Sequence, residues 1–284
     1  MSLLVARAAL LSWGGGAGLF AWLGLELASI TFFVMLLAHG VSWERTGKYL
    51  CVRGVGGVIV LWGTIFASPE TIIAGAWVKL GIVPFHFWVP PVAKEVENPI
   101  IFLFLVTGSK FAPLWVATAA VANLTPRAEF FFVATVGACF SASLGHMVDL
   151  WPVQIALSST GMGAWALAGA AINPRIGILF FYLYSIRIFV FLWPLWGKIS
   201  KTLTFGGVSY LIFLAAGGLP PGPVFWAKIL VLSQAVLKFP CFNEDFLTRD
   251  IMRGMGIIGL VAAEFVRWTI YLSVVRRARE GNYP

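Results

Sequence analysis

Four ionisable residues lie near the middle of long apolar stretches of this 284-residue chain: Glu26, Lys79, Lys110 and Lys228. A charge at the centre of a membrane-spanning helix costs about 2.5–3.5 kcal/mol on insertion scales, so such a residue needs a compensating interaction or function. The usual compensations are an ion pair, a water-filled cavity or a proton relay. Because Glu26 is the only acid near the centre of the first stretch, we expect it to pair with Lys79. The four side chains therefore predict proton transfer inside a membrane.

Helix-breaking residues accompany the lysines, and this favours a functional interpretation over a simpler one in which each ammonium group extends to the membrane surface. A proline frees the carbonyl four residues before it. Pro84 would free the carbonyl of Leu80, and Pro113 would free that of Ser109, each beside one of the lysines. Free carbonyls at membrane depth are tolerated only inside protein or along a wet cavity. Discontinuous helices next to midplane ionisable groups are typical of transporters.

The composition identifies the class of protein that must position these residues. The chain is 60% hydrophobic and 11% charged, with a mean hydropathy of +0.89, whereas soluble domains contain about 25% charged residues. We therefore predict an all-α, polytopic membrane bundle that forms a single integral-membrane domain over residues 1–284. The net charge of +8 comes from Lys and Arg residues scattered along apolar stretches and short loops. Nucleic-acid binding is excluded because no basic patch interleaved with aromatics is present.

Hydropathy predicts about nine spans, since a crossing helix needs roughly 20 apolar residues. The predicted spans cover about 16–40, 49–67, 69–90, 98–121, 128–148, 153–173, 175–197, 204–239 and 251–277. At 1.5 Å per residue the eighth would extend over about 54 Å, compared with a hydrocarbon core of ~30 Å. It contains the Gly217 to Gly222 run with two prolines, and two more turns lead to Lys228. We therefore expect a broken helix there.

The distribution of loop cations predicts the orientation. The side reached after the first span collects more of them than the opposite side, and its members are Arg45, Lys48, Arg53, Lys94, Lys198, Lys201, Arg276, Arg277 and Arg279. The positive-inside rule places this side in the matrix or cytoplasm.

Several other motifs have simple structural interpretations. Gly254 to Gly259 matches GxGxxG, but it lies in a membrane span without a preceding strand, so helix packing is favoured over nucleotide binding. The three widely separated cysteines indicate neither a disulfide framework nor a metal or iron–sulfur site. Glu264 and Arg267 are spaced i, i+3 and are expected to pair on one helix face. His86 and His146 lie near helix ends, where an interfacial position is favoured over a proton relay.

One run of residues closely resembles a known family. Lys79 to Pro90 reads KLGIVPFHFWVP, which is similar to a segment of subunit 2 of NADH–ubiquinone oxidoreductase, respiratory complex I. Further stretches agree in the same order, namely Trp22 to Leu27, Lys48 to Leu50, Ser109 to Pro113 and Gly217 to Pro221. The resemblance covers most of the chain. A lysine followed by PFHxW is shared with related antiporter-like subunits.

The resemblance implies an antiporter-like bundle with two inverted repeats, each containing a discontinuous helix. The family's essential glutamate corresponds to Glu26, its paired lysine to Lys79, the central-axis lysine to Lys110 and the broken-helix lysine to Lys228. Two departures are visible. Pro91 replaces the acid of the family's VPEV sequence, and the serine-rich run from Ser158 to Trp165 lacks the family's histidine.

The resemblance also implies a cellular context. The chain would be a subunit of the H⁺-translocating NADH:ubiquinone reductase without a redox site of its own, with FMN and iron–sulfur clusters in partner subunits. Those partners would be other membrane-arm subunits, especially related antiporter-like ones, and lipids such as cardiolipin. The short N-terminal end resembles mitochondrial versions and implies the mitochondrial inner membrane rather than a bacterial plasma membrane.

Two alternatives remain open on the sequence. One is a cation/proton antiporter subunit of the Mrp type, which would use the same chemistry without a redox partner. The other is a structural subunit in which the charges only hold helices together. Co-purification with NADH oxidoreductase activity would distinguish the first, and variants of Lys110 that disturb assembly alone would indicate the second.

Overall fold

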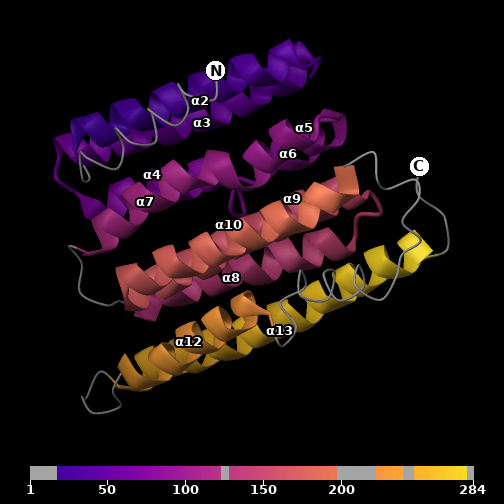
Figure 1. Ribbon diagram of the computed structural model, residues 1–284. Helices are drawn as coiled ribbons and strands as arrows, with labels where there is room; N and C mark the ends of the chain where they lie inside the picture. Colours follow the sequence, from indigo (N-terminus) through magenta and orange to yellow (C-terminus); the bar gives the residue numbers. More distant parts are fainter. Residues whose placement is uncertain (1–17, 123–127, 197–221, 239–245, 280–284) are drawn as a thin grey trace.

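The computed structural model describes residues 18–122, 128–196, 222–238 and 246–279, and its regular structure there is entirely helical (Figure 1). The predicted all-α class is confirmed for these residues. The helices are α2 (Leu19–Ala38), α3 (Trp43–Ile65), α4 (Pro69–Leu80), α5 (Val89–Glu95), α6 (Pro99–Leu103), a π-helical segment (Phe104–Gly108), α7 (Ser109–Ala122), α8 (Ala128–His146), α9 (Trp151–Ile172), α10 (Pro174–Trp196), α12 (Pro223–Lys238) and α13 (Phe246–Arg279).

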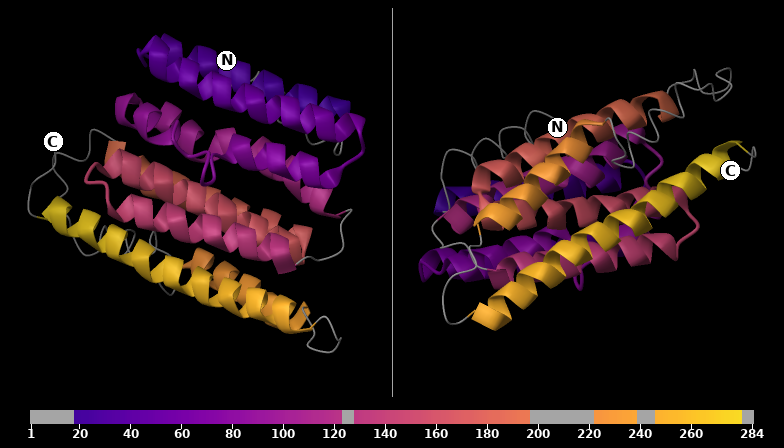
Figure 2. Two further views of the ribbon diagram at one scale, coloured as in Figure 1. Left: turned by 180° about the vertical axis from the view of Figure 1, so that it is seen from behind. Right: turned by 90° about the horizontal axis from the view of Figure 1, so that it is seen from below.

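The helices form a layered bundle whose spatial order largely follows the chain order. Figure 1 shows α2 and α3 at one side, then α4 to α7, then α8 to α10, with α12 and α13 at the far side, and the views in Figure 2 agree. Neighbouring layers are in direct contact through α3 with α4, α7 with α9, and α8 with α13. Residues that are distant in sequence therefore meet mainly where helices of adjacent layers touch.

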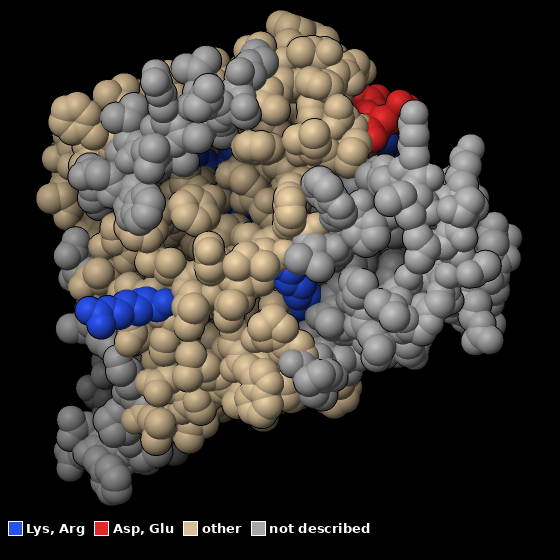
Figure 3. Space-filling view, viewed as in Figure 1, with Lys and Arg blue, Asp and Glu red and all other residues tan. Residues whose placement is uncertain are grey.

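The surface has the character expected of a membrane protein. Within the described residues, four helical stretches are long and apolar enough to cross a membrane: Leu19–Ala38, Trp43–Ile65, Pro99–Ala122 and Pro152–Ile172. Large apolar side chains are exposed on α2 and α3, including Leu23, Ile30, Val55, Val58 and Trp62. Few charged side chains lie on the face shown in Figure 3. The count of nine spans stays a prediction.

Helix α9 occupies the centre of the bundle. The most apolar part of its sequence is 100% buried, and the helix contacts α7, α8, α10, α12 and α13. Small residues make this central position possible, because they let helices approach closely. At Gly161 an added Cβ atom would overlap the Ser141 hydroxyl of α8 and the Arg267 guanidinium of α13. Glycine at this position therefore keeps three helices in contact.

The predicted span over 69–90 is interrupted after Lys79, as expected, but the break lies at a different residue from the one predicted. Helix α4 ends at Leu80, and Gly81 follows in the left-handed region with φ of 68°. Glycine adopts this conformation without steric cost and commonly ends helices. The chain then turns and enters α5 at Val89. Pro84 lies in the turn, so it frees no helical carbonyl, and the break is caused by Gly81 instead.

The predicted span over 98–121 is close to the observed one. Helix α6, the π-helical segment and α7 form a continuous apolar stretch, with Pro113 inside α7. The π-helical segment ends at Gly108, just before Lys110. Such local widening of a helix is often found at functional sites. The break predicted between Gly217 and Gly222 falls almost wholly within residues 197–221, which lie outside the described residues.

The glycine motif of the last span takes part in close helix packing, as predicted, although not at every position; its partner helix is α8. A Cβ atom at Gly256 would lie 2.8 Å from the Phe131 ring, and one at Gly259 would lie 3.4 Å from Cys139 Sγ. Gly254 faces open space. Two of the three glycines thus support the packing interpretation.

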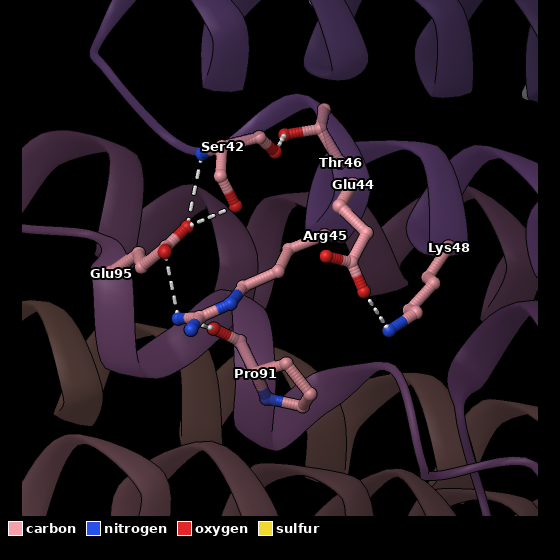
Figure 4. Close-up of polar contacts among 7 residues, drawn as sticks. All are labelled: Ser42, Glu44, Arg45, Thr46, Lys48, Pro91 and Glu95. Carbon is pink, nitrogen blue, oxygen red and sulfur yellow. Dashed lines mark hydrogen bonds and ion pairs between the residues drawn. The ribbon is translucent and has the colours of Figure 1, made fainter.

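A polar cluster ties α5 to the start of α3 (Figure 4). Arg45 Nη1 lies 2.8 Å from Glu95 Oε1, and the backbone N–H and hydroxyl of Ser42 both donate to Glu95 Oε2 at 2.9 Å. Partial burial raises the pKa of the Glu95 carboxyl, but the Ser42 hydrogen bonds and the Arg45 charge together lower the pKa below its usual 4.5. The ionised form of Glu95 therefore stabilises the link between α3 and α5.

We predict that Glu95→Gln lowers the midpoint of thermal unfolding near neutral pH by weakening this link. A lowered folded-state pKa means that the stabilisation is complete above the unfolded pKa and is lost as the pH falls through the folded pKa. The difference between wild type and variant should therefore shrink in acid below about pH 4.5. Unfolding scans in detergent at several pH values measure it, with Glu44→Gln as a control because Glu44 is 78% exposed. A difference that persists in strong acid would contradict this assignment.

Candidate functional site

The ion pair expected between the first two candidate residues is present. Lys79 Nζ donates to Glu26 Oε1 at 2.8 Å, joining α4 to α2 across α3. The Lys79 side chain is 0% exposed and that of Glu26 is 23% exposed. Burial of an ammonium group is tolerated when a carboxylate compensates its charge. The pair therefore satisfies the requirement from which it was predicted, while its role in proton transfer stays a prediction.

Two glycines of α3 make space for this pair. A Cβ atom at Gly57 would collide with Glu26 Oε1, and one at Gly56 would lie 2.8 Å from Lys79 Cγ. At the same level a Cβ atom at Gly75 of α4 would lie 2.7 Å from the Gly56 carbonyl oxygen. The absence of side chains lets the ion pair lie directly against the α3 backbone.

Lys110 has a different kind of partner. The side chain is 1% exposed, and Nζ donates to the hydroxyl of Ser159 on α9. That hydroxyl in turn donates to the Ala156 carbonyl oxygen at 2.6 Å. The partner that the structure gives Lys110 is thus a neutral group, in contrast to the carboxylates that contact Lys79 and Lys228. The serine run that departs from the family pattern contributes this contact.

Lys228 lies in a second charged cluster, between α9, α12 and α13. Its side chain is 5% exposed, and Nζ donates to Glu264 Oε2 and lies 5.8 Å from the centre of the Trp165 ring. Glu264 Oε1 also accepts a 2.8 Å hydrogen bond from Arg267 Nη1. The pairing expected between Glu264 and Arg267 is confirmed. The carboxylate is shared with Lys228, which sequence reasoning did not foresee.

Arg53 is not a loop cation, and its place in the predicted orientation set is wrong. The side chain is 1% exposed inside α3, and Nη2 donates to the carbonyl oxygens of Lys79, at 3.1 Å, and of Ser109. The Ser109 carbonyl is the one that Pro113 was predicted to free. Pro84 was predicted to free the carbonyl of Leu80, but the carbonyl that Arg53 binds is that of the neighbouring Lys79.

Sequence reasoning missed three residues of these clusters, for different reasons. Arg53 lies four residues inside its predicted span but was counted by its nearness to the loop. Glu264 was assigned only a partner on its own helix, although Lys228 approaches it from 36 positions away. Ser159 is a neutral residue in a run of small residues, so only its contact with Lys110 singles it out. The position of Arg53 within an apolar span is a signal that could have been used.

The ionisable partners that the structure brings together are lysine and carboxylate side chains. No group of three or more His, Cys, Asp or Glu side chains that could hold a metal occurs within the part of the chain that the structure describes. Lysine and carboxylate side chains each exchange one proton, and removing the partner of a buried charge costs about 3–5 kcal/mol. The protonation state of each buried lysine is therefore linked to the position of its partner.

Comparison with known proteins finds similar curated proteins. No protein-family model matches the chain. Curated proteins called NADH-ubiquinone oxidoreductase chain 2 are similar to it, including that of Sibirionetta formosa, which is 27% identical over 75% of this chain and 70% of the relative. The protein of the same name from Struthio camelus is 26% identical over 93% of this chain and 82% of the relative. The resemblance indicated by the sequence motifs is confirmed by these relatives.

A solved structure shows the same fold. A chain of respiratory complex I from Thermus thermophilus, determined with bound aureothin, superposes with a TM-score of 0.64. The match covers 99% of this chain and 77% of the other, at 17% sequence identity. The helical arrangement described above is therefore shared with a chain of that complex.

We predict that the Glu264 cluster behaves as one energetic unit. Glu264→Gln should destabilise the protein by about 3 kcal/mol, because it leaves the buried charges of Lys228 and Arg267 uncompensated. Lys228→Met combined with Glu264→Gln should cost less than the sum of the two single changes. Unfolding of the detergent-solubilised protein measures all three, and Glu129→Gln, at an exposed acid of α8, serves as the control. Strict additivity would show that the two side chains do not interact.

Proposed function

We propose that this chain is a proton-translocating subunit of the membrane arm of NADH–ubiquinone oxidoreductase, respiratory complex I. The observation that carries the proposal is the burial of three lysines, each bonded to a polar side chain of a different helix. The curated relatives and the shared fold support the choice of complex. Electron transfer from NADH to ubiquinone, with FMN and iron–sulfur clusters, would take place in partner subunits.

In this proposal the Glu26–Lys79 ion pair controls the first step. While Glu26 contacts Lys79, the carboxylate stabilises the ammonium form and retains its proton. Movement of Glu26 away from Lys79 leaves a buried ammonium without compensation, which favours release of the proton. Glu26 is the more exposed member of the pair, so it is the member that is accessible to a change in a neighbouring subunit.

The released proton would pass to Lys110 and then towards Lys228. Each transfer converts one ammonium into a neutral amine and one amine into an ammonium, so that charge is conserved. A neutral hydroxyl partner suits Lys110 because it can accept from the ammonium form and donate to the neutral amine. Lys228 would complete the path, with Glu264 stabilising the arriving charge, towards the next antiporter-like subunit or the positive face.

The proposal extends to the surroundings of the chain. Its neighbours would be related antiporter-like subunits and lipids such as cardiolipin, in the mitochondrial inner membrane or, as an alternative, a bacterial plasma membrane. Nine spans with two inverted repeats and discontinuous helices belong to the same proposal. Helical structure is interrupted between α4 and α5, next to Lys79, and this interruption supports the discontinuous helix of the first repeat.

We predict that Glu26→Gln and Lys79→Met each lower the rate of NADH-driven proton pumping at least about tenfold, because each removes a group that holds or transfers a proton. Acidification of membrane vesicles followed with a pH-sensitive dye measures this rate. Lys48→Met is the matched control, since Lys48 is 54% exposed and its partner among the described residues is Glu44, one turn away. Normal pumping by either test variant would refute the proposed role.

A further variant distinguishes the alternatives. Lys110→Met should preserve assembly and abolish pumping, because methionine fills similar volume but exchanges no proton. Blue-native electrophoresis with mass spectrometry of the co-migrating proteins measures assembly. Loss of assembly without a selective effect on transport would support a purely structural subunit. Migration without NADH oxidoreductase subunits would support a separate cation/proton antiporter.

A further inference from the structure

Glu26, Lys79 and Arg53 form the first charged cluster, and the proposed mechanism gives Arg53 no role. Arg53 is 1% exposed, yet it is not paired with a carboxylate in any contact described above. Its three hydrogen bonds end on the carbonyl oxygens of Lys79 and Ser109 and on the hydroxyl of Tyr49. A buried guanidinium is expensive to maintain, so these acceptors must account for its presence.

The two carbonyl oxygens belong to the lysine-bearing helix segments themselves. One is the carbonyl of Lys79, in the last turn of α4 before Gly81 ends the helix. The other is the carbonyl of the residue before Lys110, four positions before Pro113. Neither proline nor a helix end supplies an N–H for such a carbonyl. A single nitrogen of Arg53 bonds both and thereby connects α4 to α7.

Aromatic rings hold the guanidinium in this position. Its central carbon lies 5.2 Å from the centre of the Tyr49 ring and 5.9 Å from that of Trp88, within the range of cation–π attraction. The two rings contact each other edge to face with centres 5.2 Å apart. Trp88 also packs over Gly81, where an added Cβ would lie 3.0 Å from its ring. The cation is therefore fixed from the side of α3 and from the turn after α4.

The choice of arginine matters in two ways. Its planar group presents several donors in fixed directions, whereas lysine is a point charge on a flexible stem. It also keeps its proton throughout the physiological range. Its charge is therefore constant while those of Lys79, Lys110 and Glu26, the ionisable groups around it on α4, α7 and α2, change during transfer.

We propose that Arg53 is a positioning residue for proton transfer, which holds the backbone of Lys79 and the backbone before Lys110 at a fixed separation. This inference rests on the proposed function. Without the connection, α4 and α7 still pack side by side, but the last turn of α4 and the start of α7 lose their shared donor, and the two amines lose the alignment that transfer requires. A displacement of about 1 Å is enough to slow a transfer step by up to a hundredfold.

The test compares Arg53→Gln and Arg53→Lys in vesicles that contain the assembled complex. We expect Arg53→Gln to pump protons about tenfold more slowly and with fewer protons per NADH oxidised, although the complex assembles. Arg53→Lys keeps the positive charge and can donate a hydrogen bond. It should therefore restore part of the number of protons pumped per NADH. A residue with a merely structural role would change the amount of complex but not the number of protons per NADH.

Arg45→Gln is the matched control, because Arg45 lies on the same helix but binds Glu95 at the end of the bundle. A normal proton ratio in Arg53→Gln, together with lost pumping in Lys79→Met, would overturn the positioning role and leave the proposed function intact. Absence of both Arg53 variants from the complex on blue-native gels would reduce Arg53 to a structural residue and also overturn it. Normal pumping in Lys79→Met would overturn both proposals.

Discussion

The need to compensate an ammonium group inside an apolar bundle is the constraint on which the rest of this structure depends. Three lysines are almost fully enclosed, and each determines what its neighbours must be. Lys79 requires Glu26, and Glu26 requires Gly57, because any side chain there would displace the carboxylate. Lys110 requires a polar residue on α9, and Ser159 provides one. The positions of these helices are thus set by polar contacts as much as by apolar packing, in keeping with the weak hydrophobic drive between helices in lipid.

The two charged clusters have a similar composition and a different connection. Each contains a carboxylate, a lysine and an arginine: Glu26, Lys79 and Arg53 in one, and Glu264, Lys228 and Arg267 in the other. In the first cluster the arginine binds backbone carbonyls, so the carboxylate contacts the lysine. In the second the arginine binds the carboxylate directly, so Glu264 is shared between two cations. Removing a shared carboxylate affects both cations, whereas Glu26 can separate from Lys79 while Arg53 keeps its acceptors.

Sequence reasoning predicted the elements better than their ends and their partners. Long apolar stretches are sufficient to predict α2, α3 and α9, and a lone central acid is sufficient to predict the pair with Lys79. Hydropathy does not register the left-handed Gly81, since the residues on both sides of it are apolar, and the break after α4 was therefore assigned to Pro84. Assigning each cation to the nearest loop leads to a wrong position for Arg53. Whether an arginine is buried depends on acceptors from other helices, which the sequence does not show. The contact between Lys228 and Glu264 likewise depends on how α12 and α13 pack together.

The enclosed helix α9 has one more consequence. Ser159 meets Lys110, and Trp165, six residues further along, faces Lys228. At the rise of an α-helix these two points are about 9 Å apart along the axis. Helix α9 therefore sets the spacing between the contacts of Lys110 and Lys228. A shift of α9 along its axis by a single turn would displace Ser159 and Trp165 together, and so would change both contacts at once.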